Sequence, residues 1–208
     1  MIVIYWIHSM NVLLFLKGVF PHTIPNTALY DLVFCTDGAY DSLQEHRIKP
    51  HVISGDLDSL RERPSDIEVI ETPDQNFTDF EKALEIILKK GGTSVDVYGA
   101  SGKEQDHFLG NLSVALKFEV KITITFYDDF HRYFVTSKGC SFHTRVGKIV
   151  SLYPFPSAQN ITTKGLKYPL LNEPLELRKR IGTRNQAINT FVEIVFTKGT
   201  LIIFVERD

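Results

Sequence analysis

A chain of 208 residues, 43% of which are hydrophobic, is long enough for one large or two small globular domains with a sizeable core. Its charge is uneven, because residues 1–128 hold 11 Lys and Arg against 19 Asp and Glu, whereas residues 129–208 hold 12 against 6. This asymmetry predicts two units with different roles. The longest basic run covers only residues 178–180, which argues against a nucleic-acid partner.

The cysteines and the N-terminal stretch bear on the cellular compartment. Cys35 and Cys140 lie in apolar surroundings in different halves, without Cys-x-x-Cys or Cys/His metal spacing, so both are predicted to be free thiols. Residues 1–20 lack the basic start and the cleavage site of a signal peptide. His8 and Lys17 interrupt this stretch before it reaches the ~20 apolar residues of a membrane span. We therefore expect a cytoplasmic protein with no membrane partner.

The first 130 residues alternate predicted strands with predicted helices. Apolar residues recur at helical spacing from Phe80 to Leu88, where Gly91 and Gly92 end the pattern, and again from Leu109 to Leu116. Strands alternating with helices indicate a parallel sheet that is covered on both faces. The predicted strands are residues 12–16, 32–36, 51–54, 67–71, 95–98 and 121–127.

From residue 131 the pattern changes to short β-rich segments separated by glycine, proline and polar clusters. These segments are residues 133–136, 148–153, 191–196 and 201–205, and no long helical stripe accompanies them. We therefore predict an α/β domain with a mostly parallel sheet over residues 1–130. A small all-β sandwich domain is predicted over residues 131–208.

Acidic motifs directly follow two strands of the first domain. Asp37-Gly38 follows residues 32–36, and the segment Gly55–Ser59, with Asp56 and Asp58, follows residues 51–54. Side chains at the carboxyl ends of parallel strands meet at one rim of the sheet, where ligands bind. Two carboxylates ~4 Å apart repel by roughly 4 kcal/mol at an effective dielectric near 20, and a divalent cation removes this cost. The motifs therefore predict a Mg²⁺ site that handles a nucleotide phosphate.

The motif that opens the first helix has two interpretations. Thr78 and Glu81 fit a capping box, and Asp79 would then lie in the first turn, where the helix dipole favours an acid. Gln75, Asp79 and Lys82 also lie close together opposite the apolar stripe. Such a face can bind both a metal and a phosphate, so both interpretations remain open. Asp37 and Ser59 also have two interpretations. Asp37 can be part of a turn without binding a ligand, and Ser59 can be a helix cap.

A glycine loop over residues 99–102 lies between a strand and a helix. This order is the outline of a phosphate cradle, although the loop lacks the Gly-Lys-Ser/Thr of a Walker A motif. Asp106 can be a simple helix cap. The seven histidines form neither a zincin pair nor a triad with a nucleophile elbow, and only His107, beside Asp106, is expected near the site.

Taken in chain order, these motifs resemble those of the thiamine pyrophosphokinase family. Residues 164–170 and 182–185 resemble two further signatures, so the resemblance covers nearly the whole chain. The chain departs from the family pattern at Ala39, where a second glycine is frequent, at Glu104, where an arginine is frequent, and at Arg184, where serine is usual. Lys103 can replace the arginine as a point charge but not as a bidentate donor.

The resemblance implies an ATP-binding N-terminal domain, a C-terminal β-sandwich and a homodimer with thiamine sites between the subunits. The implied reaction converts ATP and thiamine into AMP and thiamine diphosphate. The implied catalytic acids are Asp37, Asp56, Asp58, Asp79 and Asp106, with Asp56, Asp58 and Asp79 as Mg²⁺ ligands and Asp106 as the preferred base. The implied nucleotide-binding residues are Gly38, Gly55, Ser59, Gln75, Thr78, Lys82, Gly99, Ser101, Gly102, Lys103, His107 and Asn111, and the thiamine-binding residues are Thr183 and Asn185.

Three other functions are compatible with parts of the sequence. A haloacid-dehalogenase-type phosphatase also places Asp-x-Asp after an apolar strand, and Asp56 would then be a covalent nucleophile. Against it, Gly55 precedes the motif, and the strand concerned is third in the chain rather than first. A non-catalytic nucleotide sensor would keep the site without the chemistry, and the Glu104 departure supports it. A manganese-dependent sugar-nucleotide transferase has no support beyond Asp-x-Asp itself.

Overall fold

The structure is a computed structural model that describes residues 9–208. The chain divides into two compact units, the first ending at residue 114 and including 120–124, the second comprising 115–119 and 125–208. The start of the apolar N-terminal stretch, including His8, lies outside the described residues. Over residues 9–208 no helix is long and apolar enough to cross a membrane.

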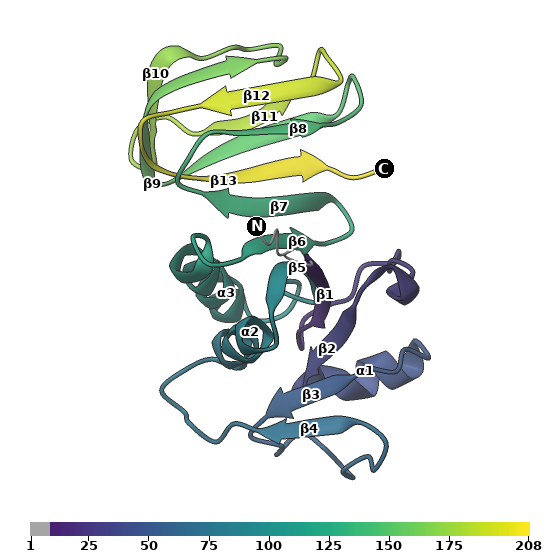
Figure 1. The fold of residues 1–208 in the computed structure, drawn as a ribbon. Helices are drawn as coiled ribbons and strands as arrows, with labels where there is room; N and C mark the ends of the chain where they lie inside the picture. Colours follow the sequence, from purple (N-terminus) through teal and green to yellow (C-terminus); the bar gives the residue numbers. More distant parts are fainter. Residues whose placement is uncertain (1–8) are drawn as a thin grey trace, which may run out of the picture. The chain divides into compact units, whose positions relative to one another are not determined.

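The first unit contains five parallel strands in the order β4-β3-β2-β1-β5 (Figure 1). Phe15 at the end of β1 pairs with Cys35 near the end of β2 and with Tyr98 at the end of β5, so the carboxyl ends lie at one edge. The order reverses beside β1, because β2 lies on one side and β5 on the other. The strands are β1 Met10–Phe15, β2 Leu32–Thr36, β3 Val52–Gly55, β4 Glu68–Glu71 and β5 Gly92–Tyr98.

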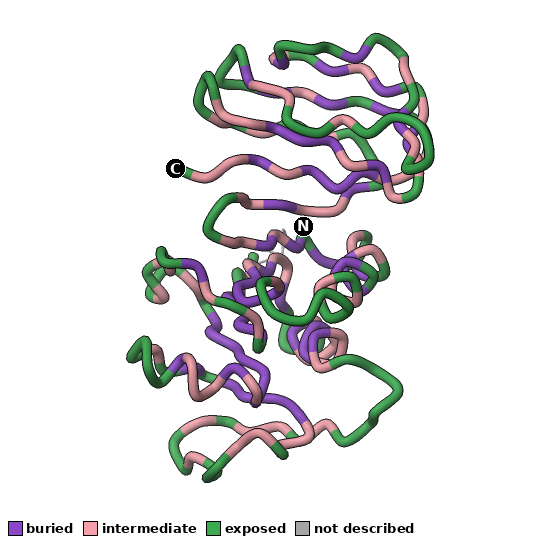
Figure 2. Tube along the Cα trace, turned by 180° about the vertical axis from the view of Figure 1, so that it is seen from behind, coloured by how far each residue is buried: buried purple, intermediate pink, exposed green. Residues whose placement is uncertain are grey.

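Helices lie on both sides of these strands, with α2 (Asp79–Lys89) on one side and α1 (Tyr40–Glu45) on the other (Figure 1). The predicted stripe of α2 is confirmed, because Phe80, Ala83 and Leu84 are buried. Helix α3 spans Gln105–Phe118, and two 3₁₀ turns occupy Thr27–Leu29 and Asp37–Ala39. The central strands are buried along most of their length (Figure 2), as expected for a sheet covered on both faces.

The second unit is built from antiparallel strand pairs. The long strand β9 organises it, because residues from Ile149 onward pair with β11 and β13, whereas residues towards Lys164 pair with β10 and β12. Strand β6 (Thr123–Tyr127) ends by pairing with β7. The other strands are β7 His131–Thr136, β8 Cys140–His143, β9 Ile149–Lys164, β10 Leu171–Glu176, β11 Gly182–Gln186, β12 Phe191–Val195 and β13 Lys198–Glu206.

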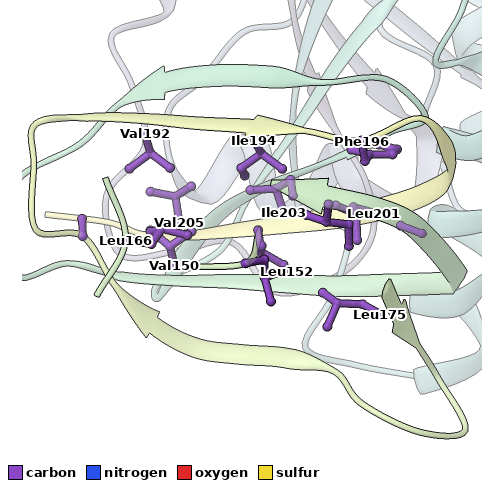
Figure 3. Packing of buried hydrophobic residues seen from close by; sticks show 14 residues of the cluster. Val150, Leu152, Leu166, Leu175, Val192, Ile194, Phe196, Leu201, Ile203 and Val205 are labelled. Carbon is purple, nitrogen blue, oxygen red and sulfur yellow. The ribbon is translucent and has the colours of Figure 1, made fainter. Parts of the chain in front are cut away.

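Alternating side chains of these strands form the core of the second unit (Figure 3). On β13, Leu201, Ile203 and Val205 point into this core, and on β12 Val192 and Ile194 do the same. The period of two is the spacing at which strand residues share one face. The buried side chains of this core come from strands far apart in the sequence. The antiparallel pairings and the apolar core therefore stabilise one another.

The predicted elements differ from the structure mainly in the second unit. Strands β8, β10 and β11 and the short helix α1 were not predicted, and β9 was expected to end at Tyr153. The strand instead continues through Pro154 and Pro156 to Lys164, because its second half finds new partners in β10 and β12. In the first unit, β5 begins at Gly92 rather than at residue 95.

Candidate active site

A pocket with a cavity volume of ≈ 520 Å³ lies at the carboxyl ends of the strands in the first unit. Its wall is formed by residues 16–18 after β1, residues 75–82 at the start of α2, residues 99–103 after β5 and the first turns of α3. This volume is in the range of small-ligand sites. The position beside β1 and β5 is the point where the strand order reverses, which is where open α/β sheets bind ligands.

Three carboxylates gather beside this pocket. Oxygen atoms of Asp37, Asp56 and Asp58 all lie within 4.8 Å of one another. Asp37 follows β2 and is buried, Asp56 follows β3 and lines the pocket, and Asp58 is exposed. Three hard oxygen donors at this spacing fit a divalent cation such as Mg²⁺.

The carboxylate of Asp37 is held by backbone groups. It accepts hydrogen bonds from the Gly38 N–H at 2.8 Å and the Leu57 N–H at 2.9 Å. Leu57 has a φ of 69°, a left-handed conformation that is uncommon for residues other than glycine. Gly55 makes room for this arrangement, because a methyl group on it would lie 2.2 Å from Cγ of Asp37. The turn after β3 therefore positions Asp37 as well as its own two aspartates.

The electrostatic environment differs within the cluster. Burial is the main cause that raises the pKa of Asp37, and the negative charges of Asp79 and Asp56 add to it, against the two backbone hydrogen bonds. The pKa of Asp56 is lowered, chiefly by the hydrogen bond from the Gln75 side-chain amide at 3.0 Å. Burial therefore disfavours the charged form of the Asp37 carboxylate, and a positive charge placed nearby would favour it.

The start of α2 is braced by Lys82. Its ammonium, on a side chain only 10% exposed, contacts Asp79 Oδ1 at 2.8 Å and donates to the carbonyls of Thr72 at 2.9 Å and Asp74 at 3.2 Å. These three acceptors match the three protons of a lysine ammonium. Thr78 caps the helix by accepting from the Glu81 N–H at 3.2 Å. Asp79 is thus paired with Lys82, although its charge still acts on Asp37.

The loops after β1 and β5 are joined along their backbones. The Gly18 N–H donates to the Gly99 carbonyl at 2.7 Å, and the Val19 N–H donates to the Ser101 carbonyl at 2.8 Å. Gly99, at a φ of +71°, lies so close to the end of β1 that a methyl group on it would meet the Leu16 carbonyl oxygen at 2.2 Å. In this structure the glycines therefore allow two loops to approach each other.

Side chains from α3 and from the β5 loop complete the wall. The Asn111 amide donates to the Ala100 carbonyl at 2.9 Å and holds the glycine loop. Asp106 is exposed to the pocket, and its Oδ1 accepts from the His107 N–H at 2.9 Å. His107 Nε2 lies 3.8 Å from a Glu104 carboxylate oxygen. Lys103 donates from its ammonium to the Lys17 carbonyl at 2.6 Å.

Most residues predicted for the nucleotide and metal site come together in the first unit. Asp37, Asp58 and the turns around Gly38, Gly55 and Ser59 form the acidic cluster and its support. Gly102 belongs to the loop after β5. The predicted residues in the pocket wall itself are Asp56, Gln75, Thr78, Asp79, Lys82, Gly99, Ser101, Lys103, Asp106, His107 and Asn111.

One side of the pocket is formed by residues that the sequence motifs do not indicate. Lys17 and Gly18 line it from the end of β1, and Asn76 and Phe77 line it from the segment before α2. The sequence does contain a sign of Lys17 and Gly18, because a lysine and a glycine follow the first apolar run in the same way as the acidic motifs follow later strands. In the sequence, Lys17 stands out only as an interruption of an apolar stretch.

The two residues predicted for thiamine binding lie on β11 of the second unit. Thr183 is exposed. The Asn185 side chain bridges the backbone of Tyr168, accepting from its N–H at 3.0 Å and donating to its carbonyl at 2.7 Å. Between them, Arg184 has a φ of 58° and donates its N–H to Ser151 Oγ at 2.9 Å. Asn185 therefore supports the segment that presents the exposed Tyr168.

Comparison with known proteins finds one family model over the N-terminal part of the chain and a second over its C-terminal part. Residues 11–126 match the family model "Thiamin pyrophosphokinase, catalytic domain", and residues 137–201 match "Thiamin pyrophosphokinase, vitamin B1 binding domain". A thiamine pyrophosphokinase of Bacillus subtilis is 25% identical over 203 residues, which cover 92% of this chain and 95% of that protein. Thiamine pyrophosphokinase 2 of Arabidopsis thaliana is 30% identical over 193 residues, covering 74% and 70%.

A solved structure extends the similarity to three dimensions. The crystal structure of thiamine pyrophosphokinase from Bacillus subtilis superposes with a TM-score of 0.81 at 25% sequence identity. The match covers 95% of this chain and 99% of that one, so both units take part in it.

Proposed function

Because the chain belongs to the thiamin pyrophosphokinase family, we propose that it transfers the pyrophosphoryl group of ATP to the hydroxyl of thiamine, forming AMP and thiamine diphosphate. The observation that carries this proposal is the pocket at the carboxyl ends of β1 and β5, with three carboxylates beside it. A nucleotide triphosphate with Mg²⁺ needs such a combination of acids, backbone loops and lysines.

For the metal we propose Asp56, Asp58 and Asp79 as ligands, with Asp37 as a further carboxylate of the same group. The spacing of the Asp37, Asp56 and Asp58 oxygens supports this assignment, as does the influence of the Asp79 charge on Asp37. Asp79 would become available when Lys82 exchanges it for another acceptor. When bound, Mg²⁺ supplies charge neutralisation on the phosphate oxygens.

In the proposed reaction the thiamine hydroxyl attacks the β-phosphorus of ATP. The bond from this phosphorus to the oxygen bridging to the α-phosphate breaks, AMP leaves, and the hydroxyl proton passes to Asp106. Positioning of the reactants provides most of the rate, and a general base contributes typically ~10²–10⁴-fold. Ser101, Gln75 and Thr78 orient phosphates from the two sides of the pocket. The remaining proposed nucleotide contacts are Gly38, Gly55, Ser59, Lys82, Gly99, Gly102, Lys103, His107 and Asn111.

For the second unit we propose thiamine binding and dimerisation. The proposed division into residues 1–130 and 131–208 follows the change from alternating helices and strands to strands alone. In this proposal the second domain is a β-sandwich, Thr183 and Asn185 contribute to the thiamine site, and two chains form a homodimer. Exposed apolar side chains on β12 and β10, including Phe191, Val195 and Leu171, support a role in association.

The reaction is tested by incubating the protein with ATP, Mg²⁺ and thiamine and quantifying AMP and thiamine diphosphate. We expect both products in equal amounts, and we expect Asp58→Asn to abolish turnover while leaving the fold intact, because Asp58 is exposed. Asp66→Asn is the matched control, since it removes an exposed carboxylate of the same unit that forms an ion pair with Lys49 and lies outside the pocket wall.

Other outcomes identify the rival functions. A phosphorylated Asp56 and thiamine-independent phosphate release would identify a phosphatase. Tight ATP binding without product would identify a nucleotide sensor. Near-normal activity of Asp58→Asn would contradict the proposed metal site.

A further inference from the structure

Lys17 differs from the other lysines of the pocket wall, because its ammonium makes no hydrogen bond or ion pair with the described residues. Three lysines line the pocket, namely Lys17, Lys82 and Lys103. The Lys82 ammonium contacts Asp79 and donates to two backbone carbonyls, and the Lys103 ammonium donates to the backbone carbonyl of Lys17. The side chain of Lys17 has no hydrogen bond or ion pair with any of the residues 9–208, and the residue is exposed. No arginine lines this pocket in the described part of the chain.

The surroundings of Lys17 hold it in place without using its charge. Its aliphatic stem lies across Gly38, since a methyl group on Gly38 would be 2.6 Å from Cδ and 3.3 Å from Cε of Lys17. Its carbonyl is held by the Lys103 ammonium at 2.6 Å. The N–H of the following residue, Gly18, is bonded to Gly99 in the β5 loop. The backbone at Lys17 is thus fixed on two sides, while its stem runs towards the turn that follows Asp37.

The charge of the pocket gives this free ammonium a role. Asp56, Asp79, Glu104 and Asp106 line the wall, so acids outnumber lysines there, and Asp37 and Asp58 lie beside it. A polyphosphate entering this wall needs cations that are not paired with an acid, and Lys82 is already paired with Asp79, whereas Lys17 has no such partner among the described residues. Lysine binds phosphate as a compact point charge and does not require the fixed fork of an arginine.

We propose that Lys17 binds a phosphate oxygen of the nucleotide triphosphate and positions the triphosphate against the Asp37, Asp56 and Asp58 cluster. This inference rests on the proposed function, because it assigns a residue to the triphosphate of that reaction. Gly38 then has a role beyond the nucleotide contact that the family resemblance implies. It provides the surface along which the Lys17 stem lies, while its own N–H serves Asp37.

The test measures binding by calorimetry in the presence of Mg²⁺ and without thiamine. The probes are ATP and inorganic tripolyphosphate, which has the phosphates but no nucleoside. We expect Lys17→Met to weaken both about tenfold, because a charge-assisted hydrogen bond is lost while the apolar stem is kept. Lys17→Arg should restore most of the affinity for both.

Lys89→Met is the matched control. It removes an exposed lysine of the same unit at the other end of α2, ~16 Å along the helix from the capping residue Thr78. Unchanged binding of both probes by Lys17→Met, or an equal loss in Lys89→Met, overturns the role of Lys17. If the wild-type protein binds neither probe, the proposed function itself is wrong. If it binds both but forms no thiamine diphosphate, the transfer reaction is wrong and the phosphate contact of Lys17 stands.

Discussion

At the scale of single residues, the acidic cluster depends on a position that has no side chain. Gly55 ends β3, and its Cα faces the carboxylate of the buried Asp37. Asp37 in turn accepts the N–H of Leu57, which ties the end of β2 to the turn after β3. Gly55 thus determines whether the carboxylates of neighbouring strands can come within reach of one cation.

Gly55→Ala is expected to destabilise the protein by about 1–3 kcal/mol, because the added methyl group overpacks the site against Asp37. The free energy of unfolding in urea, measured at equilibrium, checks this. Gly110→Ala is the control, since a methyl group on Gly110 of α3 meets no atom within 4 Å. That substitution should stabilise the protein by about 0.5–1 kcal/mol, as alanine does in helices.

A double variant locates the cause of the loss. In the double variant Gly55→Ala/Asp37→Ala the obstructing carboxylate is gone. Its loss in free energy of unfolding should therefore be smaller than the sum of the losses in the two single variants. Fully additive losses would mean that the methyl group on residue 55 meets something other than Asp37.

At the scale of elements, the start of α2 brings the polar residues of the pocket together. The helix begins at Asp79 with Thr78 as its cap, and Lys82 one turn later ties the segment 72–74 to the same end. The side of the helix that carries the apolar stripe packs on the sheet, which leaves the polar side facing the pocket. The helix cap at Thr78 and the candidate site therefore use the same segment.

Thr78→Ala should lower the free energy of unfolding by about 1 kcal/mol, because the Glu81 N–H loses its side-chain acceptor. Thr78→Ser keeps the hydroxyl and should cost much less. Denaturant titrations of both variants make the comparison. Equal losses in both would show that the methyl group of Thr78, and not its hydroxyl, supports this end of the helix.

At the scale of the whole molecule, the two units have different architectures and opposite charge. The first carries the parallel sheet and the pocket, and the second is built from antiparallel pairs around its own core. Separate family models match residues 11–126 and residues 137–201.

The proposed homodimer predicts a sedimenting mass of twice the 23.7 kDa of one chain. Association would remove the exposed apolar side chains of the second unit from water, which is the physical reason for this expectation. Sedimentation equilibrium at several protein concentrations measures the mass and the dissociation constant together. A mass of 23.7 kDa at every concentration would contradict the dimer.

Local patterns predicted the first unit better than the second. The stripe from Phe80 to Leu88 and the short apolar runs identify elements whose partners are close in sequence or arranged in a regular order. Strand β9 could not be predicted in full, since its length beyond Tyr153 depends on pairing with β10 and β12. The prolines at 154 and 156 argue against a strand beyond residue 153, but tertiary pairing continues the strand through them.

The sequence alone determined which types of residue form the site, and it indicated the family. Carboxylates and glycines that follow apolar strands form a pattern that can be recognised from the order of residues. Only the tertiary structure decided the partners. It pairs Asp79 with Lys82, groups Asp37 with Asp56 and Asp58, and places Lys17 in the pocket wall. Such contacts depend on how loops from separate strands pack at one edge of the sheet, and no local pattern encodes that distance.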